Sequence, residues 1–152
     1  MKKFLILLVI LLTSCEKEKI VVIEESLPII DYTSEVVITE VTDGDTYKFL
    51  WKGEEWRIRL LFVDTFETRF TSTLQKQAEK FNISQDSAKA LGLKAKELAE
   101  EFLIDNQVVI KRDSLEPNFD SFGRLLRTLE VDGVSFADIL GKRGLVADTI
   151  LN

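Results

Sequence analysis

The sequence predicts a mainly β fold with helices, in which five short strands form a small closed barrel. Short runs of β-branched and aromatic residues alternate with turn residues. One long segment has the apolar spacing of an amphipathic helix. The elements follow the order three strands, helix, two strands, helix, which is too sparse an alternation for a doubly wound parallel sheet. The order favours an OB-fold five-stranded barrel with one long and one short helix.

The first three strands are expected before residue 64. Asp43-Gly44 is a turn signal between the first and second strands, and Lys52-Gly53-Glu54 turns the second into the third. In the third strand apolar residues alternate with Arg57 and Arg59, so that one face is apolar and the other basic. The three strands are Val36–Val41, Thr46–Trp51 and Trp56–Val63.

A polar segment from Phe66 to about Ile83 is expected to be a loop, and a helix of about five turns follows from Ser84 to Leu103. Apolar residues recur in this helix at spacings of three and four, which places them on one face. They are Ala88, Leu91, Ala95, Leu98 and Phe102.

The C-terminal part supplies the last two strands and the short helix. Gln107–Lys111 and Arg124–Val131 are the expected strands, separated by a polar loop. Ser135-Phe136-Ala137-Asp138 resembles a capping box, and Gly144 suits the end of the helix that follows.

The N-terminal segment has the pattern of a secretory signal. Lys2 and Lys3 form a basic start, and Phe4–Leu12 is an unbroken apolar run. This run is too short to span a bilayer, which takes roughly 20 residues. Leu12-Thr13-Ser14-Cys15 resembles a bacterial lipobox, in which the cysteine is acylated after cleavage, and Cys15 is the only cysteine in the chain.

We therefore expect a lipoprotein signal peptide at 1–14, a tether at 15–34 and one folded domain at 35–152. The expected location is extracytoplasmic, with the protein anchored to a membrane through Cys15 and otherwise monomeric. Loss of Lys2 and Lys3 would change the formal charge from -6 to -8, because 18 basic residues would remain against 26 acidic ones. Such an acidic protein is poorly suited to coating nucleic acid, although local positive potential remains compatible with a nuclease.

The chain contains no histidine, which excludes Ser-His-Asp triads and zinc sites built on imidazole. Acid–base chemistry must then come from carboxylates, lysine, tyrosine or water. Asp45 and Asp64 stand at the ends of neighbouring strands and suit a hard divalent cation such as Ca²⁺. Arg59 and Arg124 suit a phosphate, because a guanidinium stays charged and can hold two oxygens. Glu67 is the candidate general base.

Each of these residues alone has an ordinary structural interpretation, as a turn, a surface ion pair or a solvated loop. Together they resemble the thermonuclease family (staphylococcal nuclease-like) segment by segment. The family pattern is D-G-D-T, then R-L-L-x-V-D-T-P-E-T, then Y-G-R. This chain has Asp43-Gly44-Asp45-Thr46, then the run from Arg59 to Thr68, then Phe122-Gly123-Arg124. The resemblance covers about residues 35–147.

The resemblance implies a Ca²⁺-dependent endonuclease on an OB-fold barrel, with DNA or RNA, or both, as substrate. Asp45, Asp64 and the backbone carbonyl of Thr65 would hold the metal ion. Arg59 and Arg124 would stabilise the transition state, and Glu67 would be the general base.

The chain departs from the family pattern at three places. Phe66 replaces the usual proline, which is expected to loosen the loop that carries Glu67. Ser121 stands where a lysine is usual. Ile150 and Asn152 stand where two tyrosines would help to hold a nucleotide, and the family's C-terminal helix does not follow.

Two other interpretations remain open at the level of sequence. The barrel could be a catalytically weak or inactive module that binds nucleic acid or protein. It could also be an envelope lipoprotein whose barrel serves only as an interaction surface.

Overall fold

The computed structural model describes residues 33–149 and shows a closed barrel of five strands accompanied by three helices. The predicted OB-like barrel is thereby confirmed. Cys15, the expected signal peptide and almost all of the expected tether lie outside the described residues. The first strand starts at Thr33, two residues earlier than the expected start of the domain.

The barrel strands follow one another through hydrogen-bonded pairs in the order β3-β2-β1-β5-β6, and a parallel pairing of β3 with β6 closes the ring. The other pairings in the ring are antiparallel. The strands are β1 (Thr33–Val41), β2 (Thr46–Trp51), β3 (Glu54–Leu60), β5 (Gln107–Lys111) and β6 (Leu125–Val131).

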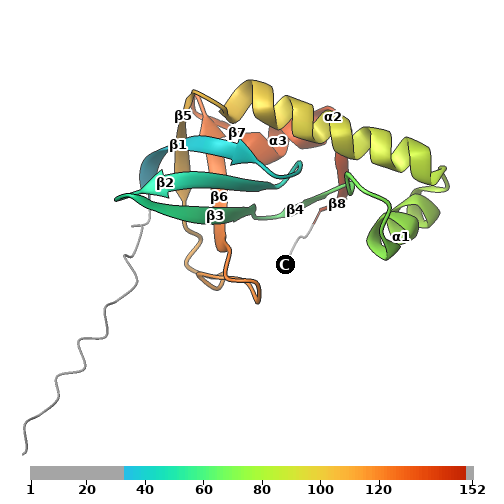
Figure 1. Ribbon diagram of the computed structural model, residues 1–152, viewed down its shortest axis with the longest axis horizontal. Coiled ribbons are helices and arrows are strands. Elements are labelled where there is room, and N and C mark those ends of the chain that lie inside the picture. Colours follow the sequence, from blue (N-terminus) through green and yellow to red (C-terminus); the bar gives the residue numbers. More distant parts are fainter. Residues whose placement is uncertain (1–32, 150–152) are drawn as a thin grey trace, which may run out of the picture.

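Three short strands lie outside the ring. β7 (Val134–Ser135) extends β6 after a tight turn. β4 (Val63–Thr65) pairs antiparallel with β8 (Val146–Thr149) and forms a separate two-stranded sheet. Phe62, which separates β3 from β4, has a φ of 67°. The expected third strand, Trp56–Val63, is therefore broken at this residue, and β4 leaves the barrel toward α1 (Figure 1).

The sequence predicted two helices, but the described part of the chain has three. α1 (Ser72–Phe81) lies in the segment expected to be a loop. Thr71 caps its first turn by accepting a hydrogen bond from the Leu74 N–H, and Asn82 ends it with a φ of 51°. The segment is polar because α1 buries only a narrow stripe, Leu74, Gln77 and Ala78. This stripe is too narrow to stand out as a periodic pattern.

The other two helices agree with their predictions. α2 (Gln85–Leu103) begins after Ser84, whose hydroxyl accepts from the Ser87 N–H, and runs from beside α1 back over the barrel (Figure 1). α3 (Phe136–Lys142) begins after Ser135, whose hydroxyl accepts from the Asp138 N–H. No helix within residues 33–149 combines the length and apolar character needed to cross a membrane.

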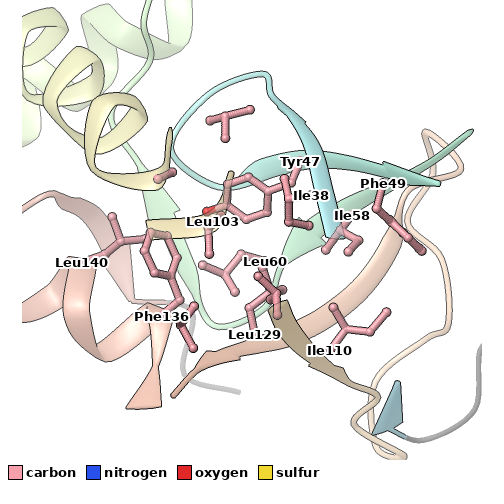
Figure 2. Packing of buried hydrophobic residues seen from close by; sticks show 14 of the residues in the cluster. Ile38, Tyr47, Phe49, Ile58, Leu60, Leu103, Ile110, Leu129, Phe136 and Leu140 are labelled. Carbon is pink, nitrogen blue, oxygen red and sulfur yellow. The ribbon is translucent and has the colours of Figure 1, made fainter. Parts of the chain in front are cut away.

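The main core fills the barrel and the space beneath α2 and α3 (Figure 2). Alternate residues of each strand point inward, so that Phe49, Ile58 and Leu129 meet inside the ring, and Tyr47 packs edge-on against Phe136 of α3. Burial of so many apolar side chains is the main source of stability in a domain that has no disulfide.

A second, smaller core holds α1 in place. Phe66 is only 2% exposed and packs edge-on against Phe81, with ring centroids 5.2 Å apart. Lys80 of α1 also forms an ion pair of 2.8 Å with Asp148 of β8. α1 is thus fixed against the segment that follows β4. The other buried members of this cluster are Leu74, Ala78, Ala88 and Ala147.

Candidate functional site

The six candidate site residues within the barrel domain come together in one pocket. The pocket lies where the turn before β2, the end of β3, the strand β4 and the start of β6 meet, and its lining is polar. It contains four carboxylates and two guanidinium groups, so its formal charge is -2. The lining residues are Asp43, Asp45, Arg59, Asp64, Thr65, Phe66, Glu67 and Arg124.

Asp45 is fixed against Thr65 by two hydrogen bonds. Its Oδ2 accepts from the Thr65 N–H at 2.7 Å and from the Thr65 hydroxyl at 2.8 Å. Gly44 allows this approach, because a Cβ at that position would lie 2.7 Å from Thr65 Oγ1 and 2.7 Å from Ala95 Cβ. The Asp43-Gly44-Asp45 turn is therefore a packing element as well as a turn, and it holds β4 against α2.

Arg59 lies between the two predicted ligand carboxylates. Its Nη1 forms an ion pair with Asp45 Oδ1, and its Nη2 donates to Asp64 Oδ1. The side chain of Asp45 is 5% exposed and that of Arg59 is 15% exposed, so this pair is largely shielded from water. Because both carboxylates bind one guanidinium, their Oδ1 atoms converge on the same region of the pocket.

The pKa of Glu67 is raised above its ordinary value, the direction expected for a carboxylate that acts as a general base. Partial burial is the largest cause, and the neighbouring charges of Asp43 and Asp64 add to it, whereas Arg59 acts in the opposite direction. The pKa of Asp43 is also raised, mainly by burial, against the lowering effects of Thr46, Arg59 and Arg124. Arg59 and Arg124 thus lower the pKa of Asp43 but do not outweigh the effect of its burial.

Arg124 is oriented by two partners on opposite sides. Its Nε donates to Asp120 Oδ2 at 2.6 Å, and its Nη1 donates to the Thr46 hydroxyl at 3.1 Å. Burial raises the pKa of Asp120, but hydrogen bonds from Arg124 and Phe122 outweigh it, so that the pKa is lowered overall. Asp120 thus stays ionised and holds Arg124 at the rim of the pocket.

The segment Asp64–Glu67 is packed on both sides, although the replacement of proline by Phe66 was expected to loosen it. Phe66 is buried in the small core beneath α1 and anchors the segment from below. α2 supports it from the other side at Gly92, where a Cβ would lie 2.4 Å from the Phe66 carbonyl oxygen and 2.6 Å from that of Glu67. The buried side chain of Phe66 and the close approach of Gly92 are the contacts that hold this segment in the absence of a proline.

Gln77 is a site residue that sequence reasoning missed. It lies on α1, is 8% exposed, and its amide bonds to three positions of the Asp64–Glu67 segment. Gln77 follows Leu74 by three residues and precedes Ala78, so it lies on the buried face of α1. This spacing was the only signal in the sequence, and it could not be used because α1 had not been predicted.

The oxygen donors of the pocket fit a hard divalent cation. The Oδ1 atoms of Asp45 and Asp64 converge on the Arg59 guanidinium, the net charge of the pocket is negative, and Thr65 belongs to its lining. Within residues 33–149 no three acidic or thiol side chains cluster closely enough to form a metal site by themselves. Asp45, Asp64 and the Thr65 carbonyl would therefore hold an ion only with further oxygens from solvent or substrate, as is usual for Ca²⁺ and Mg²⁺.

Comparison with known proteins gives a distant relative without a known activity. No family model matches the chain. An uncharacterized protein of Methanocaldococcus jannaschii is 32% identical over an alignment of 122 residues, which covers 76% of this chain and 59% of that protein. The chain thus spans less than two thirds of the length of this relative.

Proposed function

We propose that this protein is a metal-dependent nuclease of the thermonuclease type, which hydrolyses phosphodiester bonds of DNA, RNA or both. The observation that carries the proposal is the convergence of two arginines, two ligand-type carboxylates and a carboxylate of raised pKa in one polar pocket. The residues come from three segments of the chain, at Asp45, at 59–67 and at Arg124, and the pairing of β3 with β2 and with β6 brings these segments side by side.

In the proposed reaction, water attacks phosphorus while Glu67 accepts its proton; the P–O bond to one of the two nucleoside oxygens breaks, and that leaving oxygen takes up a proton from solvent. Partial burial and the charges of Asp43 and Asp64 favour proton uptake by Glu67. Arg59 and Arg124 reach the pocket from β3 and from the start of β6, so they can stabilise negative charge on the phosphoryl oxygens from two sides. The backbone around Glu67 is held by α1 and α2, which limits the motion of the base.

Ca²⁺ is the proposed cofactor, with Asp45, Asp64 and the Thr65 carbonyl as its protein ligands. When bound, Ca²⁺ would offset the negative charge of the pocket and of the substrate phosphate. We further propose that the domain is anchored outside the cytoplasm through acylated Cys15, which lies outside the described residues.

The test is degradation of single-stranded DNA and of RNA by purified residues 25–152, with Ca²⁺ and with a chelator. We expect cleavage with Ca²⁺ and its loss on chelation. A folded protein that binds oligonucleotides but cleaves neither substrate would contradict the proposal and would favour a binding module.

A further inference from the structure

The amide of Gln77 has a hydrogen-bonding pattern that matches the Asp64–Glu67 segment. Its Oε1 accepts from the Glu67 N–H at 3.0 Å. Its Nε2 donates to Asp64 Oδ2 at 3.2 Å and to the Thr65 carbonyl at 3.0 Å. One buried side chain therefore bonds to both proposed metal-ligand residues of this segment and to the backbone of the proposed base.

The chemistry of these partners requires an amide at this position. An N–H group needs an acceptor, while a carboxylate and a carbonyl need donors, and a glutamine side chain supplies one acceptor and two hydrogens. A glutamate could accept but, when ionised, could not donate, and it would place a negative charge beside Asp64. A methionine of similar length would leave the Glu67 N–H and Asp64 Oδ2 without their Gln77 partner.

Gln77 is held in place by the helix that carries it. Its neighbours on the buried stripe of α1, Leu74 and Ala78, belong to the small core around Phe66. Lys80, less than one turn further on, is paired with Asp148 of β8. The amide is thus presented from a helix that packs directly on Phe66 of the same segment.

We propose that Gln77 is a positioning residue of the metal site, which sets the orientation of Asp64 and the Thr65 carbonyl toward the cation and of Glu67 toward the attacked phosphorus. This inference rests on the proposed function. Groups that orient metal ligands in this way commonly affect metal affinity or turnover by roughly 10–100-fold. α1 is then part of the site rather than a surface addition to the barrel.

The decisive variant is Gln77→Met in residues 25–152, with Gln75→Met as the matched control on the exposed face of the same helix. Gln75 is exposed and donates only to Glu79 Oε1, at 2.9 Å. We expect Gln77→Met to weaken Ca²⁺ binding in calorimetry by roughly 10-fold or more. We also expect a lower kcat with little change in KM, and wild-type values for Gln75→Met.

A second variant covers the case in which Gln77→Met does not fold. Gln77→Glu keeps the size of the side chain and the acceptor for the Glu67 N–H, and we expect its kcat to fall by roughly 10-fold as well. Wild-type Ca²⁺ affinity and kcat in a folded Gln77 variant would overturn the inference, because a role in packing alone changes stability and not these quantities.

Failure of the proposed function would look different. A wild-type protein that binds Ca²⁺ without cleaving nucleic acid would contradict the proposed nuclease activity. The Ca²⁺ affinity of Gln77→Met would still decide the role of Gln77. A wild-type protein that binds no Ca²⁺ would overturn both.

Discussion

The Cα of Gly92 faces the backbone of Phe66 so closely that a Cβ would lie 2.4 Å from the Phe66 carbonyl oxygen. α2 therefore touches the Asp64–Glu67 segment through main-chain atoms, with no side chain between them. A backbone carbonyl cannot rotate away as a flexible side chain can, so any residue larger than glycine must displace either the helix or the segment.

Gly92→Ala should therefore destabilise the protein and reduce activity, although alanine is the better helix former. In an unobstructed helix, replacing glycine by alanine stabilises by about 0.5–1 kcal/mol. Gly141→Ala in α3 is the matched control, because a Cβ there meets nothing within 4 Å. Denaturant unfolding should show opposite signs for the two variants, and equal stabilisation would contradict the close approach.

Much of the fold could be predicted because the local signals were strong. Thr46–Trp51 and Gln107–Lys111 agree with β2 and β5 to the residue, and Ser84 and Ser135 cap the two predicted helices. α1 was missed because its buried stripe contains Gln77, which does not count as apolar in a periodicity argument. β4 and β3 were merged because Phe62 adopts a φ of 67°, which no sequence pattern signals for a phenylalanine.

The candidate site residues were selected from their order along the chain and lie in one pocket, but the residues that support them could not be predicted. Gln77 and Gly92 act through contacts between elements that are separate in the sequence, whereas Asp120 bonds to Arg124 four residues further on, through a loop geometry that no sequence pattern signals. The burial of Arg127 inside the barrel could not be predicted from the sequence either. Arg127 stands at an inward position in the alternation of β6, but a charged side chain is not expected to be buried. The residue is nevertheless 0% exposed, and its guanidinium donates to Asn118 Oδ1 at 2.7 Å.

Arg59→Ala should lower cleavage by roughly 10²–10³-fold, the usual cost of losing a group that stabilises transition-state charge. It should also destabilise the metal-free protein by about 3 kcal/mol, because Asp45 would be left buried without its cationic partner. Arg59→Lys should recover little activity, since one ammonium group cannot reproduce the bridge between Asp45 and Asp64.

The measurements are cleavage per folded molecule and denaturant unfolding in chelator. Arg143→Ala is the control, because Arg143 is exposed at the end of α3 and lies outside the pocket. If Arg59→Ala cleaved nucleic acid at the wild-type rate, the proposed role of Arg59 in stabilising the transition state would be contradicted.

The pH dependence of kcat/KM should reflect the raised pKa of Glu67. A general base must be ionised, so activity should fall on the acidic side at a pH above the ordinary glutamate value of 4.5. Asp43→Asn removes one of the charges that raise this pKa, and should move the acid limb to lower pH. Glu67→Gln should be slower by roughly 10²–10⁴-fold, and its kcat/KM should no longer show the fall on the acidic side.

Asp132→Asn tests whether any change of net charge has the same effect. Asp132 is exposed in the turn after β6 and has a φ of 50°, which asparagine also tolerates. An acid limb that is unchanged in Glu67→Gln would assign the titration to another group and would contradict the role of Glu67 as the base.

Stabilisation of the fold by Ca²⁺ should increase with pH. The pKa values of Asp43 and Glu67 are raised in the folded protein, from ordinary values of 3.8 and 4.5, so these groups hold protons that the unfolded chain has already lost. Their contribution to stability is therefore present at low pH and is lost as the pH rises through the folded pKa values. A cation in the pocket favours the ionised carboxylates and should offset this loss.

At a Ca²⁺ concentration of 100 times Kd, we expect a stabilisation of about 2.7 kcal/mol at neutral pH, measured as a rise in Tm, and a much smaller rise near pH 4. The pKa of Asp120 is lowered, so its contribution runs in the opposite direction. Comparing samples with and without Ca²⁺ at each pH removes that contribution, because Asp120 is not part of the pocket lining. Asp64→Asn should abolish the rise at every pH, and a rise that persists in this variant would place the ion elsewhere in the protein.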